Sequence, residues 1–359
     1  MAAAIILGNL TNRKHGRMKP NRLYRTAIFL VALVAISLTG MAWAAPAKEL
    51  RLGHFPNMTH AQAVLARANG HFQQRVGVPI KWTSFNAGPT AIEALLTDAI
   101  DVTFVGPNPA INGFIRSQGA KFVIIAGSAS GGAGLVVRSN SAINTERDFG
   151  GKTVATPQLG NTQDVAARNW LAARGYKLKE KGGSVTLLPL SNPDQLTLFR
   201  KGEIDAAWTV EPWLARLELE GDGKLLLEEK TLWPEGRYVT THLVVRREFL
   251  LANAVLIKKL LTAHVEVTRQ INEDKLAAGK ILNAELKKET GKALPDPVIE
   301  RAMQRVEFTW DPISSSLRQS AEAAHKIGFL RAPPNLTGIY SLGLLNEVLK
   351  ELNLPAVVE

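Results

Sequence analysis

The chain nearly repeats itself between its early and its middle segment. The dipeptide Ile100-Asp101 recurs as Ile204-Asp205, 104 positions later, and the same offset relates Pro89 to Pro193, Phe104 to Trp208, and Leu50-Arg51-Leu52 to Val154-Ala155-Thr156. Each copy reads as strands alternating with helices, separated by proline-containing turns, which is the pattern of a largely parallel α/β unit. Two such units in one chain predict two lobes that face each other across a cleft, an arrangement suited to binding a ligand between them.

Residues 1–44 have the pattern of a cleavable secretory signal peptide. Six basic residues and no acid precede an apolar run that starts at Thr26 and ends at Gly40, and the small-residue site Ala42-Trp43-Ala44 follows. This order of basic flank, apolar stretch and Ala-x-Ala site is typical of secretion signals. The run is short for a membrane span, which needs roughly 20 apolar residues, so an uncleaved anchor is the less favoured interpretation. Met18 is an alternative start.

Composition excludes several classes of function. The chain has no cysteine, which rules out disulfides, thiolate metal sites, a cysteine nucleophile and a lipid-modified cysteine. After removal of the leader the chain is only mildly basic and its charges form no runs, so we expect no nucleic-acid partner. The mature protein is therefore expected to be a soluble periplasmic monomer without a cofactor.

The lobes are expected to be discontinuous in sequence. Residues 45–138 begin lobe 1, residues 139–240 form lobe 2, and residues 241–359 return to lobe 1. The similar strand-like segments Gly134–Arg138 and Thr240–Arg246 are the expected crossings, with hinges near Val137–Ser139 and Thr240–Leu243. From Glu248 the pattern is almost wholly helical, and these C-terminal helices are expected to pack on lobe 1.

Loops after the predicted strands carry the candidate binding groups. In an open parallel sheet, ligands lie beyond the carboxyl ends of the strands, where the loops enter helices. These loops are rich in Gly, Asn, Thr, Ser and Pro and contain no Lys or Arg: Phe55–Thr59, Asn86–Thr90, Gly106–Pro109, Gly160–Asp164, Ser191–Asp194 and Val210–Trp213. Helix N-termini present unpaired N–H groups and a partial positive charge. The pattern therefore favours an anion held by neutral donors.

Other segments have two interpretations each. Thr59 is a candidate N-cap for a helix over His60–Asn69. The stretch Ser128–Gly134 is either a wide hinge-side loop that approaches a ligand or a flexible crossing; it lacks the spacing of a phosphate or dinucleotide loop. Glu211 is either a first-turn acid that complements a helix dipole or a cleft carboxylate that meets an ammonium or a hydroxyl. Of Trp208 and Trp213, one is expected in the core and the other at the pocket wall.

Catalytic and metal-binding patterns are missing from the sequence. His54, His60 and His242 could converge at the mouth of the cleft, but lone histidines are more often surface or core residues. There is no H-E-x-x-H spacing, no Gly-x-Ser-x-Gly elbow and no Ser-His-Asp arrangement. We therefore expect neither a metal site nor catalytic residues.

Several motifs together resemble the periplasmic solute-binding proteins of aliphatic-sulfonate, taurine and nitrate ABC importers. They are Asn86–Leu96 with Ile100–Val102, Gly202–Ala206 with Glu211–Trp213, and Glu307–Pro312 with Ser316-Leu317. The resemblance spans Glu49 to about Leu345 and implies a two-lobed α/β fold of the type II-like periplasmic binding class, with two hinge crossings. It also implies closure on a ligand and docking to an ABC permease in the inner membrane.

The resemblance is greatest to the sulfonate branch, whose members hold the sulfonate with the loops matched here by Asn86–Thr90, Gly106–Pro109 and Gly160–Thr162. Taurine binders carry an acid at the position of Glu211. Together with the loop analysis, this gives as expected ligand-binding residues Asn57, Thr59, Asn86, Gly88, Thr90, Asn108, Ser128, Gly160, Asn161, Thr162, Glu211 and Trp213.

The expected function is capture of a small anionic organic solute of the sulfonate type, an alkanesulfonate or taurine, for an ABC importer. Nitrate, bicarbonate or a pyrimidine precursor are the alternative ligands, and a sensory ligand-binding module is a further possibility. In a different class, a periplasmic dehydratase of the same fold would use Glu211 with His54 or His242 as acid and base.

Overall fold

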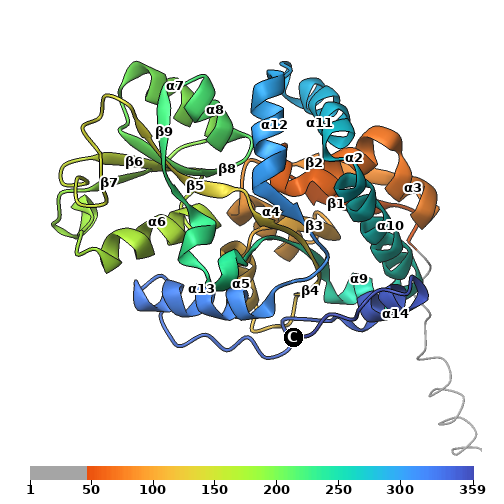
Figure 1. The fold of residues 1–359 in the computed structure, drawn as a ribbon. Coiled ribbons are helices and arrows are strands. Elements are labelled where there is room, and N and C mark those ends of the chain that lie inside the picture. The colour runs from red at the N-terminus through yellow and green to blue at the C-terminus, as the bar shows by residue number, and fades with distance from the viewer. Residues whose placement is uncertain (1–46) are drawn as a thin grey trace, which may run out of the picture. The chain divides into compact units, whose positions relative to one another are not determined.

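The computed structural model describes residues 47–359, so the leader predicted at residues 1–44 lies outside the described residues. Two mixed sheets divide this part of the chain into two lobes (Figure 1). Lobe 1 holds the six-stranded sheet, with the order β11-β4-β10-β3-β1-β2, and lobe 2 the five-stranded sheet, with the order β7-β6-β8-β5-β9. Separate apolar clusters form the cores of the two lobes.

In lobe 1 the strands are β1 (Leu50–His54), β2 (Ile80–Ser84), β3 (Val102–Val105), β4 (Phe122–Gly131), β10 (Val239–Arg246) and β11 (Val306–Phe308). Its helices are α2 (Ala61–Asn69), α3 (His71–Val76), α4 (Gly88–Leu96), α5 (Pro107–Arg116), α9 (Arg247–Ala252), α10 (Ala254–Glu273), α11 (Lys275–Thr290), α12 (Asp296–Arg305), α13 (Ser314–Lys326) and α14 (Gly343–Glu351).

In lobe 2 the strands are β5 (Ala133–Arg138), β6 (Thr153–Thr156), β7 (Thr186–Pro189), β8 (Ala206–Val210) and β9 (Gly223–Glu228), with helices α6 (Thr162–Ala173), α7 (Asn192–Lys201) and α8 (Trp213–Leu219). Short 3₁₀ helices are η1 (Met58–His60) in lobe 1, η2 (Lys179–Lys181) in lobe 2, and η3 (Glu229–Leu232) and η4 (Pro234–Gly236) in the segment that leads back to lobe 1. Within residues 47–359, no helix combines the length and the apolar character that crossing a membrane would require.

The sequence repeat corresponds to a repeat in structure. The strand order β2-β1-β3-β10-β4 in lobe 1 matches β7-β6-β8-β5-β9 in lobe 2, with β10 and β5 the antiparallel members beside β3 and β8. The two-lobed α/β architecture is therefore confirmed. It also explains why the repeat centres on Ile100-Asp101 and Ile204-Asp205, which immediately precede the equivalent strands β3 and β8.

Asp101 and Asp205 tie the same three strands together in each lobe. An Asp101 carboxylate oxygen accepts from the Arg51 backbone N–H at 3.0 Å, and an Asp205 oxygen accepts from the Thr153 N–H at 2.9 Å. Arg246 and Arg138 each pair with their lobe's aspartate from the antiparallel strand. Arg51 is thus equivalent to Thr153, and the predicted offset is two residues too long for the first strand of each unit.

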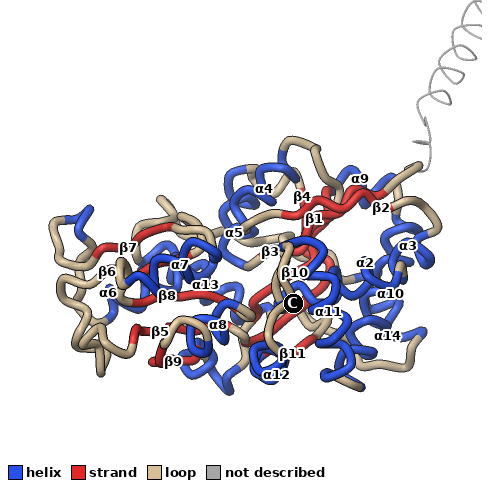
Figure 2. Tube along the Cα trace, turned by 90° about the horizontal axis from the view of Figure 1, so that it is seen from above, coloured by secondary structure: helices blue, strands red, loops and turns tan. Residues whose placement is uncertain are grey.

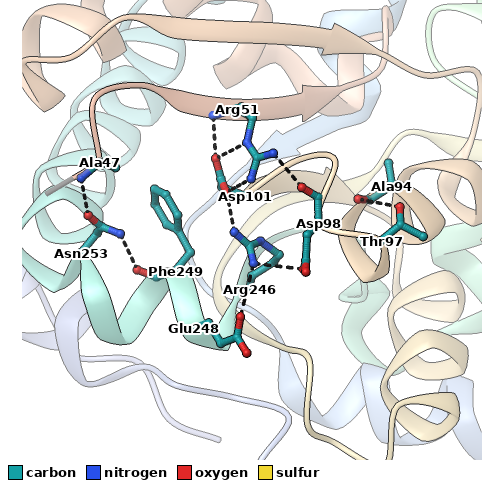
Figure 3. Close-up of polar contacts among 10 residues, drawn as sticks. All are labelled: Ala47, Arg51, Ala94, Thr97, Asp98, Asp101, Arg246, Glu248, Phe249 and Asn253. Carbon is teal, nitrogen blue, oxygen red and sulfur yellow. Dashed lines mark hydrogen bonds and ion pairs between the residues drawn. The ribbon is translucent and has the colours of Figure 1, made fainter. Parts of the chain in front are cut away.

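Figure 3 shows the lobe 1 version of this contact, where Asp101 lies between the guanidinium groups of Arg51 and Arg246. Burial alone would raise the pKa of Asp101, but the hydrogen bonds from the two arginines outweigh it and leave the pKa below its usual value. The ion pair joins β1 to β10, which are neighbours of β3 on opposite sides.

Both crossings between the lobes lie earlier in the chain than the sequence predicted. Strand β4 ends at Gly131 and β5, already in the lobe 2 sheet, begins at Ala133, so the first crossing is at Gly131-Gly132, where both residues have positive φ. Val137 and Ser139 lie at the far end of β5, away from this crossing. The second crossing is the segment 229–238 between β9 and β10. Of the two interpretations of Ser128–Gly134, the wide loop is wrong, since most of the stretch belongs to two buried strands, but the stretch does contain the crossing at Gly131-Gly132.

The C-terminal segment packs mainly on lobe 1 but also contacts lobe 2. Helix α10 lies against α3 and α14, and α11 against α2, whereas α12 reaches α8 and α13 reaches α6 (Figures 1 and 2). The sequence missed strand β11, which pairs with the end of β4 at the edge of the sheet. The predicted N-cap role of Thr59 is also wrong: His60 precedes α2, and the Thr59 hydroxyl donates to Asn57.

Candidate functional site

A cavity lies between the two lobes at the N-termini of several helices. It encloses about 390 Å³ of space, part of it open to solvent. Lobe 1 and β10 contribute Phe55, Asn57, Thr59, His60, Asn86, Ala87, Gly88, Gly106, Pro109, Thr240 and Thr241, and lobe 2 contributes Pro157, Asn161, Thr162, Gln163, Asn192 and Val210. We call this the anion cavity.

Four helices begin at the anion cavity, two from each lobe. They are α4, α5, α6 and α7, each 9 to 12 residues long. Proline near the first position of α4, α5 and α7 fixes a helical φ where the missing N–H costs nothing. Because the first-turn N–H groups of a helix lack intrahelical partners, these ends give the cavity a positive potential from two sides.

Within the described part of the chain, residues 47–359, no Lys, Arg, Asp or Glu lines the anion cavity. The polar side chains that line it are amides and hydroxyls from both lobes and the imidazole of His60 from lobe 1. Neutral donors can hold an anion without leaving an unpaired buried cation when the ligand departs. The lining therefore favours an anion without a positively charged group of its own.

Four of the five side-chain amides that line the cavity have their oxygens engaged inside the protein, and the exception, Asn86, donates its NH₂ to the Pro157 carbonyl. The Asn57 oxygen accepts from the Thr59 hydroxyl at 2.9 Å, the Asn192 oxygen from the Thr209 hydroxyl at 2.9 Å, and the Gln163 oxygen from the Asn161 amide at 3.1 Å. Among residues 47–359, the NH₂ groups of Asn57, Gln163 and Asn192 have no hydrogen-bond partner. The cavity is thus supplied with donors whose acceptor atoms are already engaged.

His60 also has its acceptor atom engaged inside the protein. Its Nδ1 accepts from the Phe55 backbone N–H at 3.2 Å, and its ring stacks on Phe55 at 4.1 Å between centroids. An imidazole that accepts at Nδ1 carries its proton on Nε2 when neutral. Burial, and next the nearby His54, lower the pKa of His60 well below its usual value, so the ring is a neutral donor.

Six of the residues predicted from the sequence line the anion cavity: Asn57, Thr59, Asn86, Gly88, Asn161 and Thr162. The other six do not belong to its lining. Thr90 donates to the Ala87 carbonyl within α4, and Ser128 is buried in β4 where it donates to Gln62. Gly160 faces Phe329 of lobe 1, and Asn108 and Trp213 line other cavities.

Glu211 lies outside the lining of the anion cavity. Its carboxylate accepts from the Ala215 N–H in the first turn of α8 at 3.0 Å and pairs with Arg305 of α12 at 3.1 Å. Burial raises the pKa of Glu211 to about 7, although the Ala215 N–H and Arg305 act to lower it. Glu211 therefore contributes to an ion cluster between the lobes, in which Arg305 also meets Glu218 and Glu228.

The other predicted histidines and tryptophans have structural partners. His54 contacts Glu289 at 2.8 Å, and His242 contacts the Pro312 carbonyl at 3.1 Å, so neither joins His60 at the cavity. Trp208 is fully buried, and Trp213 lies beneath the Arg216 guanidinium. No group of three or more His, Asp or Glu side chains within residues 47–359 is arranged to hold a metal ion.

Sequence reasoning missed several lining residues inside loops that it did identify. Phe55, Asn192 and Val210 belong to those loops but were not singled out. Thr240 and Thr241 were expected only at a hinge, and they reach the cavity because β10 runs beside β3. The Thr240 hydroxyl donates to the Gly131 carbonyl, which links the cavity directly to the first crossing.

The sequence model of the NMT1-like family matches residues 43–283 of this chain. Among curated proteins, a putative aliphatic sulfonates-binding protein of Bacillus subtilis is 27% identical over 53% of this chain and 56% of its own length. The taurine-binding periplasmic protein of Escherichia coli is 25% identical over 55% of this chain and 58% of its own length. The chain thus matches somewhat more than half the length of these two relatives.

Solved structures share the fold of the chain. The alkanesulfonate-binding protein SsuA of Xanthomonas axonopodis, bound to MOPS, has a TM-score of 0.70 at 22% identity, covering 84% of this chain and 100% of the other. The periplasmic nitrate-binding protein NrtA of Synechocystis has a TM-score of 0.73 at 18% identity, covering 87% and 91%. At these identities the likeness establishes the architecture and not the ligand.

Proposed function

Since the chain belongs to the NMT1-like family, we propose that it is the periplasmic solute-binding component of an ABC importer and captures a small sulfonate-type anion. The observation that carries the proposal is the set of neutral donors, with the oxygens of Asn57, Gln163 and Asn192 already engaged, in a cavity that no charged side chain of residues 47–359 lines. The names of the sulfonate- and taurine-binding relatives support the same ligand class. Delivery to an inner-membrane permease, export through the N-terminal leader and a monomeric state are parts of this proposal.

A plain alkanesulfonate fits the cavity better than taurine does. Taurine carries an ammonium, and a buried ammonium needs a carboxylate partner, but Glu211 is occupied by Ala215 and Arg305 outside the lining. We therefore expect Glu211→Gln to leave the preference between ethanesulfonate and taurine unchanged. A selective loss of taurine binding in this variant would instead show that Glu211 reaches the ligand.

Calorimetric titration of the mature protein tests the proposal with methanesulfonate, ethanesulfonate, taurine, nitrate, sulfate and bicarbonate. The alkanesulfonates should bind most tightly, and their affinity should change little between low and high salt because the donors are buried dipoles rather than exposed charges. Tightest binding of nitrate or bicarbonate would contradict the ligand class. Turnover of a bound compound would favour the dehydratase alternative over a binding protein.

Asn57→Asp is the sharpest variant for this test, because it replaces the NH₂ donor by a carboxylate of the same shape. Repulsion between the carboxylate and the anion should weaken alkanesulfonate binding by about a hundredfold or more. Asn144→Asp makes the same chemical change at an exposed position and should leave the affinity unchanged. Equal affinities of the two variants would show that Asn57 does not face the ligand.

A further inference from the structure

A second cavity lies between the lobes, next to the anion cavity. It encloses about 940 Å³ of space, part of it open to solvent, and is bounded by the start of α5, one face of α6, the η3–η4 segment and α13. The α6 face is formed by residues at helical spacing, among them Thr162, Val165, Ala166 and Ala173. Because most of these side chains are small, α6 leaves room between itself and α13.

Three aromatic side chains, Trp170, Trp233 and Tyr238, line this second cavity together with apolar and polar residues that include Arg174 and Glu229. Trp233 stacks on Tyr238 with centroids 5.2 Å apart and planes 3° from parallel. Trp170 lies on the α6 side, with the Arg174 guanidinium 4.1 Å above its ring. The volume and the lining suit a ring or a short hydrocarbon chain better than a second anion, and we call this space the aromatic cavity.

Thr162 lines both cavities, and it is the only residue shared by their linings among the described residues. It comes from lobe 2 and meets Gly106 of lobe 1 at the boundary. A Cβ on Gly106 would lie 2.2 Å from the Thr162 hydroxyl oxygen and 3.5 Å from the Thr240 carbonyl oxygen. The side chain of Thr162 therefore fills the gap through which the two cavities would otherwise join.

The Thr162 hydroxyl contributes little to the fold itself. It is buried, and it has no hydrogen-bond partner within residues 47–359. A hydroxyl that were there only to stabilise the closed lobes would be expected to donate to a neighbour, since an unpaired buried hydroxyl costs free energy. Its position at the boundary, with one side on each cavity, points to a role toward the ligand.

We propose that Thr162 is a gate residue that limits the length of the ligand. This inference rests on the proposed function, because it assigns a size limit to the same anion site. With Thr162 on Gly106, the anion cavity ends at the boundary and accepts only sulfonates with a short organic group. Without the Thr162 side chain, the space behind it is the aromatic cavity, which accepts a longer or aromatic group on the same sulfonate.

Variants of Thr162 separate the gate from the loss of its hydroxyl. Thr162→Ala removes both the methyl and the hydroxyl and opens the boundary. Thr162→Val removes the hydroxyl but keeps the volume, so the boundary stays closed. In both variants, the affinity for methanesulfonate measures binding to the anion cavity alone, and the affinity for benzenesulfonate measures binding that also needs the aromatic cavity.

We expect Thr162→Ala to raise the affinity for benzenesulfonate relative to methanesulfonate at least about tenfold, the scale of a gain in apolar contact within a pocket. Thr162→Val should keep the wild-type ratio, whatever the hydroxyl contributes to both ligands. Adding Ala166→Phe to Thr162→Ala fills the aromatic cavity and should return the ratio toward that of the wild type. Calorimetry measures all four proteins with the two ligands.

An unchanged ratio in Thr162→Ala would overturn the gate, provided that the variant still binds methanesulfonate. So would equal affinities of the wild-type protein for the two ligands, or an equal rise in Thr162→Val. Failure of the proposed function gives a different result, in which neither the wild-type protein nor any variant binds methanesulfonate.

Discussion

Gly106→Ala should weaken ligand binding without destabilising the ligand-free protein. The backbone of Gly106 has φ −70° and ψ 162°, which alanine adopts without strain. The added methyl would lie 2.2 Å from the Thr162 hydroxyl oxygen across the two lobes, well inside van der Waals contact. The clash therefore exists only when the lobes are closed, and an opening of the lobes relieves it.

The size of the effect follows from the cost of overpacking. An extra methyl group in a packed interior costs about 1–3 kcal/mol, which corresponds to a rise in Kd of about 5- to 150-fold. Thr162→Ala removes the clashing oxygen and leaves the next contacts of the Gly106 methyl at 3.4 Å and beyond. In the double variant the Gly106→Ala penalty should therefore disappear relative to Thr162→Ala alone.

Calorimetry with methanesulfonate measures the four affinities of this cycle, and thermal unfolding without ligand measures the stability of each variant. Gly150→Ala is the matched control, because a Cβ at that exposed glycine meets no atom within 4 Å. Wild-type affinity in Gly106→Ala, or a penalty that persists in the double variant, would refute the closed-state contact between these two residues.

Three further expectations concern a hydrogen-bond donor, an ion cluster and the buried titratable groups. His60→Phe keeps the stacking on Phe55 but removes the Nε2–H, so Kd for methanesulfonate should rise about tenfold; unchanged affinity in calorimetry would contradict a donor role. Arg305→Gln removes the only cation that pairs with Glu211 among residues 47–359, whereas Glu218 keeps Arg301 and Glu228 keeps Lys230. The variant should lower the free energy of unfolding in urea by about 3 kcal/mol. Arg116→Gln, which breaks an exposed pair with Glu93, should cost less than about 1 kcal/mol, and similar losses in both would refute the importance of burial. Stability in urea should fall as the pH drops from 6.5 toward 4, since buried imidazoles with lowered pKa values bind protons only on unfolding. The buried imidazoles are those of His54, His60, His242 and His264. They outnumber the two buried acids with raised pKa values, Glu211 and Glu229, which act in the opposite direction. A stability that rises as the pH falls from 6.5 to 4 would contradict the lowered pKa values of these histidines.

Much of the fold was predictable because its signals are local. The helix expected over His60–Asn69 is present as α2, which Gly70 ends in a left-handed conformation, and the expected proline-containing turns lead into α4 and α7. The repeat around Asp101 and Asp205 was visible because the same carboxylate contact recurs in both lobes. The helix ends depend on residues near one another in sequence, whereas the aspartate contacts span 50 and 52 residues and were visible only because they recur.

The crossings were misplaced because glycine has two uses that a sequence does not distinguish. The stretch Ser128–Gly134 looks like a loop, but a Cβ at Gly127 would lie 2.0 Å from the Asp311 carbonyl, and one at Gly134 would lie 2.6 Å from the Leu227 carbonyl. These two glycines allow close backbone packing, Gly134 against β9 of its own sheet and Gly127, just before the stretch, against the loop that precedes α13. Only Gly131 and Gly132 adopt the positive φ of a true bend.

The candidate site was predictable loop by loop but not residue by residue. Glu211 follows β8 as Gly106 follows β3, yet its partner Arg305 lies 94 positions away on α12. The sequence does not show this pairing, and so it could not place the carboxylate outside the cavity. In the same way, the donor character of the amides depends on which hydroxyl each oxygen meets.

The place of β10, between β4 and β3 in lobe 1 although it follows lobe 2 in the chain, has a consequence for the order of folding during synthesis. Lobe 2 is one continuous stretch from β5 to β9, whereas the lobe 1 sheet needs β10 between β4 and β3. During synthesis from the N-terminus, β3 and β4 are made before β10. Until lobe 2 and β10 have been synthesised, the edges of β3 and β4 that β10 will pair with therefore stay exposed. We expect lobe 2 to acquire structure first, and a chain truncated before Val239 to leave lobe 1 unable to assemble.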